Sequence, residues 1–214
     1  MIYRRLILIL LTLTFPLAGV SGAEQPMRVL TSASRPHLEL EIDASFTALP
    51  RLLFPLQFTN VDRRIFVEAD KSRIVQRMII VQFEKVRNGS RFKFVYPPKP
   101  PIVFGSETYR FGAYVYDDAK SAASQPGMEA ARTRSAIGKL GYHLPRLFRT
   151  ARLARVADPL GQSEVIIFYF ENADASYLNG VLPNADADGD LALGHSAAQS
   201  LFESMKAVIH PITG

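Results

Sequence analysis

The chain of 214 residues contains no cysteine. It therefore has no disulfide framework, no N-terminal cysteine to lipidate and no thiol nucleophile. A domain of this length needs no crosslink, because it buries roughly 70% of the surface of its unfolded chain. Histidine is scarce, and the spacing of its four copies does not suit a metal site: His37, His143, His195 and His210.

Long apolar runs are also missing after residue 23, where none approaches the roughly 20 residues of a spanning helix. Before it, Arg4 and Arg5 precede an apolar stretch that reaches Val20, and small residues end the segment at Ala23. This pattern predicts a cleaved signal peptide at residues 1–23, too short and too interrupted for a permanent anchor.

We accordingly expect a single soluble domain over residues 24–214 that is secreted or periplasmic, with no membrane span once the leader is removed. Export argues against nucleic acid as a partner. Because the leader carries two arginines and no acidic residue, the formal net charge falls from +5 to +3 when it is lost. The basic character of the whole chain is thus partly a property of the leader.

Apolar alternation and β-branched runs predict a sheet. Strands are expected over residues 38–42, 65–67, 78–86, 92–96, 109–116, 153–157 and 165–170. Asn88-Gly89 predicts a type I′ hairpin between the third and fourth of these, because both residues tolerate positive φ. The strand at 165–170 is apolar or aromatic throughout, so we expect it in the centre of the sheet with both faces covered.

Two helices are predicted later in the chain. Apolar residues at helical spacing favour one over residues 127–140, ended by Gly141. A longer apolar stripe from Ala198 to Ile209 favours a C-terminal helix, with Ser196 and Gln199 as its capping box. The expected fold is α+β, with an antiparallel sheet of about six to eight strands, a middle helix and a C-terminal helix.

A weak internal resemblance offers a variant of this fold. Residues 67–84 and 156–171 both consist of a strand, a turn, an apolar strand and a glutamate. With residues 45–56 as a poorly formed helix of the first copy, the chain would be a pseudo-duplicated strand-helix-strand-strand arrangement with a groove between its halves. The alternative is a chance likeness of two apolar hairpins.

One polar segment has the pattern of a calcium loop. Oxygen-bearing side chains stand at alternate positions, followed by a glycine that permits a sharp turn: Asn184, Asp186, Asp188 and Asp190, with Gly189. His195 occupies the twelfth place, where a bidentate glutamate would close such a site. The sequence therefore predicts at most one calcium ion with a structural role, and the alternative is an acidic loop in solvent.

A second candidate is basic. Residues 130–157 contain no acidic residue, and four arginines follow one another at every third position: Arg146, Arg149, Arg152 and Arg155. They are candidates for contact with an anionic envelope component, such as phospholipid headgroups, lipopolysaccharide or an acidic polysaccharide. The alternative is that acidic residues elsewhere in the fold pair with them.

No catalytic motif is present. The serine in Leu193–Ala198 resembles a nucleophile elbow, but no aspartate and histidine follow it in the required order. Glu84 and Glu171 end similar apolar strands, so a pair of carboxylates facing across a groove is one possibility and plain exposure the other. No residue is assigned a catalytic role.

Three functions remain open. The first is non-enzymatic binding of a hydrophobic or amphiphilic small molecule such as a lipid, in a groove lined by aromatic residues: Phe92, Phe94, Tyr96, Tyr109, Phe111, Tyr114, Tyr116, Phe168 and Phe170. The second is a cell-envelope module with a calcium-stabilised loop, and the third is a hydrolase. A deep apolar cavity would favour binding, whereas carboxyl groups with perturbed pKa values in a cleft would favour an enzyme.

Overall fold

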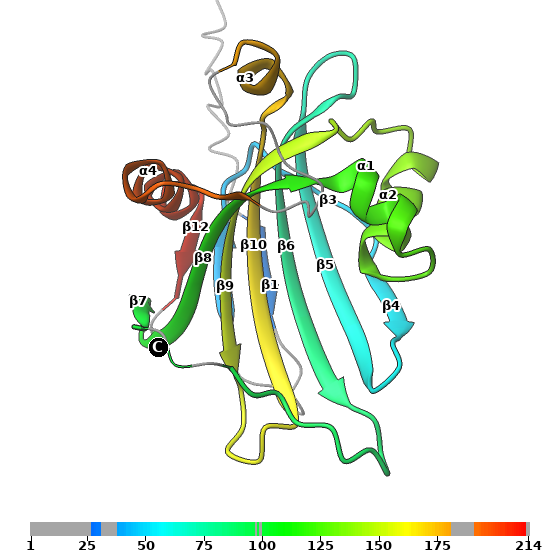
Figure 1. Cartoon of the computed structure of the whole chain (residues 1–214), viewed down its shortest axis with the longest axis vertical. Coiled ribbons are helices and arrows are strands. Elements are labelled where there is room, and N and C mark those ends of the chain that lie inside the picture. The colour runs from blue at the N-terminus through cyan, green and yellow to red at the C-terminus, as the bar shows by residue number, and fades with distance from the viewer. Residues whose placement is uncertain (1–26, 31–37, 97, 99, 181–190, 213–214) are drawn as a thin grey trace, which may run out of the picture.

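Figure 1 shows the computed structural model, in which a long, curled antiparallel sheet dominates. The structure describes residues 27–30, 38–96, 98, 100–180 and 191–212. The strands are β1 (Met27–Leu30), β2 (Glu39–Ile42), β3 (Thr47–Ala48), β4 (Leu52–Pro55), β5 (Thr59–Ala69), β6 (Val75–Val86), β7 (Ile102–Phe104), β8 (Glu107–Asp117), β9 (Leu147–Val156), β10 (Ser163–Asn172), β11 (Leu191–Ala192) and β12 (Ile209–Pro211). The helices are α1 (Asp118–Ser124), α2 (Glu129–Lys139), α3 (Asp174–Leu178) and α4 (His195–Lys206).

The main sheet has the order β11-β8-β9-β10-β6-β5-β3, with β4 also paired to β5 and β7 to β8. Its pairings are antiparallel. β10 lies between β9 and β6, which confirms the prediction that the apolar segment at 165–170 is central. This α+β fold agrees with the expected one.

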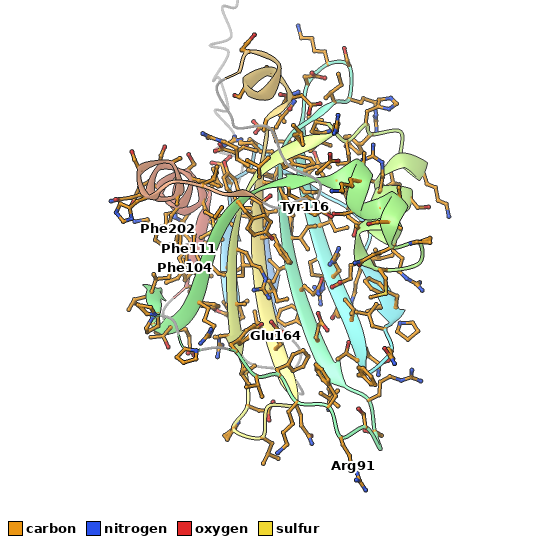
Figure 2. All side chains as sticks on the ribbon, viewed as in Figure 1. Arg91, Phe104, Phe111, Tyr116, Glu164 and Phe202 are labelled. Carbon is orange, nitrogen blue, oxygen red and sulfur yellow. The ribbon has the colours of Figure 1, made fainter. Side chains whose placement is uncertain are left out.

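One face of the main sheet is closed by a second layer. The closed face consists of apolar residues at alternate strand positions, among them Ile79, Val81 and Ile167, all fully buried. A small sheet of order β1-β2-β12 and the apolar stripe of α4 pack against it. Figure 2 shows Phe104, Phe111 and Phe202 clustered beside α4, in keeping with ring centroid distances of 6.4 and 5.2 Å from Phe202.

Among the residues that the structure describes, helices cover the opposite face, called the pocket face, at one end only. There α2 lays Ile137 against Ile65, Met78 and Phe170 of the sheet, and a second core forms. Figure 1 shows α1 and α2 beside the upper part of β5 and β6, whereas their lower part extends beyond the helices. A single sheet therefore carries two unlike faces, because successive side chains along a strand point to opposite sides.

The predicted helix over 127–140 is present as α2. The chain leaves it at Leu140, and Gly141 has a φ of 78°, the left-handed conformation expected of a residue that ends a helix. The C-terminal helix is also present, but its predicted capping box is wrong. α4 begins at His195 after Gly194, so Ser196 lies inside the first turn and makes no side-chain cap.

The predicted hairpin at Asn88-Gly89 is also wrong. A type I′ turn needs positive φ at both central residues, and only Gly89 has it, at 83°. β6 ends at Val86, and residues 92–96 cross the end of the sheet without forming a strand. β6 pairs instead with β5, which precedes it in the chain. β5 is far longer than the three residues, 65–67, that were predicted for this strand.

The pseudo-duplicated arrangement fails in its first half. β8, α1, α2, β9 and β10 do form a strand-helix-strand-strand unit. Residues 45–56, expected as the equivalent helix, form β3 and β4 instead, both paired to β5.

The turn at 158–161 is as predicted, with the Gly161 amide donating to the Asp158 carbonyl at 3.1 Å. Across the described ranges, no helix has the length and apolarity needed to cross a membrane.

Candidate functional site

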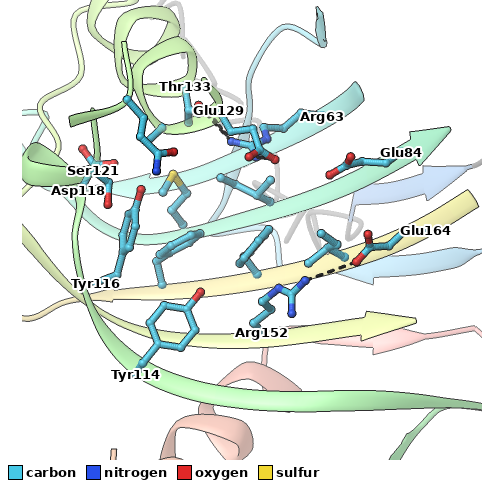
Figure 3. A pocket seen from close by; sticks show the side chains of 17 residues that line it. Arg63, Glu84, Tyr114, Tyr116, Asp118, Ser121, Glu129, Thr133, Arg152 and Glu164 are labelled. Carbon is cyan, nitrogen blue, oxygen red and sulfur yellow. Dashed lines mark hydrogen bonds and ion pairs between the residues drawn. The ribbon is translucent and has the colours of Figure 1, made fainter. Parts of the chain in front are cut away.

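A cavity of about 400 Å³ lies on the pocket face, between the sheet and the two helices α1 and α2 (Figure 3). It is lined by Arg63, Met78, Ile80, Glu84, Tyr114, Tyr116, Asp118, Ser121, Gln125, Glu129, Ala130, Thr133, Arg152, Glu164, Ile166, Phe168 and Phe170. Its volume is in the range of small-molecule sites.

The lining changes character along the cavity. Figure 3 shows Glu84 and Glu164 at one end, and Tyr114, Tyr116, Asp118 and Ser121 toward the other. The floor between them is apolar and comes from alternate positions of the two neighbouring strands β6 and β10: Met78, Ile80, Ile166, Phe168 and Phe170. The cavity therefore combines an apolar middle with two polar ends.

Two buried carboxyl groups form the first polar end. Glu84 and Glu164 stand directly opposite each other on the neighbouring antiparallel strands β6 and β10, and only 9% and 4% of their surfaces are exposed. Glu84 accepts hydrogen bonds from Thr59 Oγ1 at 2.9 Å and Gln82 Nε2 at 2.5 Å. Glu164 is paired with Arg152 at 3.4 Å. Two like charges placed opposite each other in a sheet are unfavourable when both are ionised.

This arrangement raises the pKa of both carboxyl groups. Burial, helped by the charge of Glu84, raises the pKa of Glu164 from its ordinary 4.5 to about 8. Burial and then the charge of Glu129 raise the pKa of Glu84, against the hydrogen bonds from Thr59 and Gln82. Arg152 opposes the rise at Glu164, because a nearby cation favours the ionised carboxyl. Burial prevails over these opposing contacts at both sites, so the pair holds its protons to a higher pH than free glutamates do.

A buried arginine ties α2 to the sheet above this pair. Arg63 donates through Nε to Gln82 Oε1 at 2.6 Å and through Nη1 to Thr133 Oγ1 of α2 at 2.5 Å. It also forms an ion pair with Glu129 at 3.4 Å. Gln82 in turn donates to Glu84 and, at 2.7 Å, to Glu129. Burial lowers the pKa of Arg63, but a guanidinium keeps its charge in proteins.

The other polar end lies at the start of α1. Asp118 is 3% exposed and is hydrogen-bonded to Arg134 of α2. Burial raises the pKa of Asp118, and the Arg134 partner opposes the rise. Tyr114 and Tyr116 place their rings on the same face of β8. This end offers hydrogen-bonding groups around one carboxyl group that already has a cation.

The four arginines predicted as one patch are separated by the fold. Arg149 and Arg155 lie on the closed-face side of β9 and pair with Glu171 and Glu107, while Arg146 pairs with Asp117 at 2.9 Å. Only Arg152 reaches the cavity, where it contacts Glu164, Tyr96 and the ring of Phe168. Spacing by three alternates faces along a strand, which is why the four do not converge.

The aromatic residues predicted to line a groove are also divided. Four of them line the cavity: Tyr114, Tyr116, Phe168 and Phe170. Tyr109 and Phe111 belong to the closed face instead, and Phe92, Phe94 and Tyr96 lie on the segment that crosses the end of the sheet. The proposed pair of Glu84 and Glu171 does not form, because Glu171 is on the other face, bonded to Arg149 and Tyr169.

The predicted calcium ligands Asn184, Asp186, Asp188 and Asp190 lie outside the described residues, so the calcium site stays a prediction. In the part of the chain that the structure does describe, no group of three or more His, Asp or Glu side chains could hold a metal ion.

Glu164 and Arg63 are the residues that reading the sequence missed. Both interrupt the apolar positions of a strand on its buried face, and alternation in the strands could have flagged them. Comparison with known proteins adds no relative, since no family model matches the chain and neither curated proteins nor solved structures give a match.

Proposed function

We propose that this protein binds an amphiphilic small molecule in the cavity of the pocket face. The observation that carries the proposal is a space of about 400 Å³ with an apolar floor and polar groups at both ends. Sites for small molecules commonly combine apolar walls with a few placed polar groups that fix orientation. The lining contains more charge than the deep apolar cavity expected for a simple lipid carrier.

The lining also predicts which part of the cavity each chemical group of the ligand would occupy. A flat or aliphatic body fits over Ile80, Ile166 and Phe168, because apolar surface there is removed from water on binding. Hydroxyl, amine or amide groups that donate hydrogen bonds fit the end formed by Glu84 and Glu164. A carboxylate or phosphate there would meet like charge whenever the pair is ionised, so we expect anionic heads to be disfavoured at that end.

Matched naphthalene probes test this proposal. We expect 1-naphthylmethanol and 1-naphthylmethylamine to bind, detected by naphthalene fluorescence, and 1-naphthylacetate to bind at least tenfold more weakly. Ala130 lines the cavity from α2, so Ala130→Phe should fill the space and weaken binding of both favoured probes by tenfold or more. Ser135→Phe, on an exposed position of the same helix, should leave binding unchanged.

Two outcomes would contradict the proposal. One is the absence of binding by all three probes, together with no copurified small molecule in mass spectrometry of the native protein. The other is equal binding by the Ala130→Phe variant and the unaltered chain while circular dichroism shows both folded. Either result would mean that the cavity is not a ligand site.

A second candidate function is hydrolysis, and the carboxyl pair is the observation that favours it. Glu164, whose pKa is raised to about 8, is a candidate proton donor, and Glu84, which accepts hydrogen bonds from Thr59 and Gln82, is a candidate proton acceptor; both line the cavity. Carboxyl groups whose environments move their pKa values apart serve as acid and base in many hydrolases. Carboxyl groups with perturbed pKa values in a cleft are also what an enzyme would require, and they support this second candidate.

Turnover distinguishes the two functions. Release of 4-nitrophenol from 4-nitrophenyl esters and glycosides, with a bell-shaped pH dependence, would support hydrolysis. Both Glu84→Gln and Glu164→Gln should then remove the activity, whereas Glu203→Gln, at an exposed position of α4, should retain it. Probe binding without turnover of any of these substrates would leave the binding function as the better proposal.

We further propose that the protein acts outside the cytosol, as the leader pattern at residues 1–23 predicts. Sequencing the N-terminus of the protein recovered from the exported fraction of the expressing cells tests this. The expected first residue is Glu24, and recovery of the chain only from the cytosol with Met1 retained would contradict it.

A further inference from the structure

Three loops meet at the end of the main sheet where β6 and β9 finish. The Phe58 carbonyl accepts from the Arg87 amide at 2.8 Å, and the Gly161 carbonyl accepts from the Phe94 amide at 2.8 Å. The Val86 amide donates to the Gln162 carbonyl, also at 2.8 Å. These bonds join residues 55–58, 85–96 and 158–162 into one unit, which we call the loop end.

The loop end exposes large apolar side chains. Val95 is 81% exposed, Leu160 65%, Phe58 43% and Phe92 37%. The rings of Phe58 and Phe92 stack with centroids 5.4 Å apart, so two loops present one aromatic surface. Apolar groups gathered on an exposed surface are typical of contact sites. A binding partner outside the described residues would be needed to bury this one.

Cations surround these apolar groups. Residues 85–95 contain Lys85, Arg87, Arg91 and Lys93, all exposed, and no acidic residue. None of the four has an ion-pair partner among the described carboxylates. Figure 2 shows Arg91 at the extreme lower end of the molecule, pointing away from the sheet.

The three loops contain one acidic residue, Asp158, against four cationic ones. Asp158 accepts through Oδ1 from the Leu160 amide at 2.9 Å and shapes the turn that exposes Leu160. The loop end is therefore cationic as well as apolar. The arginines paired along β9 differ in this respect, since each of them has an acidic partner.

We propose that the loop end docks on the surface of a bilayer that contains anionic phospholipid. Exposed lysines and arginines attract the acidic headgroups, while aromatic and aliphatic tips enter the boundary between headgroups and acyl chains. A water-soluble polyanion would be held by the cations alone and would gain nothing from Val95 and Leu160. The combination of both features favours a membrane surface over nucleic acid or an acidic protein.

The proposal concerns a surface separate from the cavity and does not depend on ligand binding there. Tyr96, at the end of the same segment, accepts a hydrogen bond from Arg152 at 3.2 Å and lies near the carboxyl end of the cavity. A docked loop end would hold that end of the cavity beside the membrane.

Cosedimentation with vesicles tests the proposal, using protein recovered from the exported fraction so that the same processed chain is compared throughout. We expect binding to phosphatidylcholine vesicles with about 30% phosphatidylglycerol, and at least tenfold weaker binding to phosphatidylcholine alone. The double variant R91E/K93E should lose tenfold or more in affinity. K71E/K120E, which makes the same charge change at exposed positions away from the loop end, should lose less than threefold.

The apolar tips have their own control. V95S and F92S should each weaken vesicle binding by threefold or more, whereas I74S should not, although Ile74 is 37% exposed like Phe92. Equal losses in the two charge variants would overturn the proposal, because they would show attraction by net charge alone. So would heparin binding equal to vesicle binding with V95S and F92S unaffected, which would assign the loop end to a soluble polyanion.

Discussion

The two faces of the main sheet are built from the same strands, yet they differ in how densely they are packed and in how much charge they carry. On the closed face, Ile79, Val81 and Ile167 pack in one apolar cluster with residues of β2, β12 and α4. Their neighbours in sequence, such as Ile80, Gln82 and Ile166, lie on the pocket face, which also carries Glu164 and where a cavity remains. The closed face supplies packing, and the pocket face retains space and charge.

This difference concerns the free energy of folding that each face contributes. A filled face gains free energy from every apolar atom removed from water, whereas a hollow face with buried carboxyl groups gives some of it up. The binding proposed for the pocket face would therefore depend on stability supplied by the closed face. Four experiments test this difference between the two faces.

The largest effect is expected from shortening a residue on each face of β10. Ile167→Ala, on the closed face, should lower the free energy of unfolding by about 3 kcal/mol, because it leaves a void among well-packed atoms. Ile166→Ala, beside the cavity, should cost about half as much, since fewer contacts are lost. Urea denaturation measures both, and equal costs would show that the two faces are packed alike.

The second effect is the response to pH. Glu164 has a folded pKa of about 8 against an ordinary 4.5, so the folded state holds the proton more tightly. The stabilisation is fully present below pH 4.5 and is lost as the pH rises through 8. Because Arg152 offsets part of the shift, we expect a loss of about 2 kcal/mol between pH 5 and pH 9.

Glu164→Gln should remove this loss, since glutamine does not titrate, and Glu203→Gln on α4 should leave it in place. Urea denaturation of the three proteins at several pH values is the measurement. A wild-type stability that is flat from pH 5 to pH 9 would show that Glu164 is ionised in the folded protein throughout.

The third effect concerns the layer that closes the apolar face. Gly105 has a φ of 67°, and a Cβ added there would lie 2.6 Å from the Cβ of Pro211 in β12. Gly105→Ala should therefore cost about 2 kcal/mol, from backbone strain plus displacement of β12. Gly89→Ala has a similar φ of 83° with nothing within 4 Å, so it should cost about 1 kcal/mol. Thermal unfolding of both variants compares them, and equal costs would mean that β12 yields without penalty.

The smallest effect is expected from a surface ion pair on α4. Lys206 and Glu203 are 2.8 Å apart, with side chains 41% and 58% exposed, so solvent screens their attraction. Lys206→Ala should change the free energy of unfolding by less than about 0.5 kcal/mol. A loss above 1 kcal/mol in urea denaturation would show that charge, as well as apolar packing, holds the closing layer.

Local patterns predicted much of the fold. The apolar run at 165–170 marked the central strand, and the helical spacing before Gly141 marked α2. The turn after Val86 was predicted wrongly, since Asn88-Gly89 is a frequent hairpin pair but the chain there bonds to Phe58 and Gly161, which are distant in sequence. Residues 45–56 were misread because their strands are short and owe their form to pairing with β5.

The candidate site was much less predictable. Alternation predicts which residues of β6 share a face with Glu84 and which residues of β10 share a face with Glu164. It does not predict whether the two glutamates lie on the same face of the sheet. Only the register between β6 and β10 sets the two carboxyl groups opposite each other. The same register sends Glu171 to the closed face, which is why the pair expected from similar strand ends does not exist.

The leader pattern and the lack of thiols follow from the sequence alone. So do the residue pattern of each strand and helix and the apolar stripe of α4. The tertiary structure decided which charges are paired, which are buried and where space is left. The physical reason is range: periodicity and turn chemistry act between close neighbours in the chain, whereas ion pairing, burial and cavities depend on contacts between residues that only folding brings together.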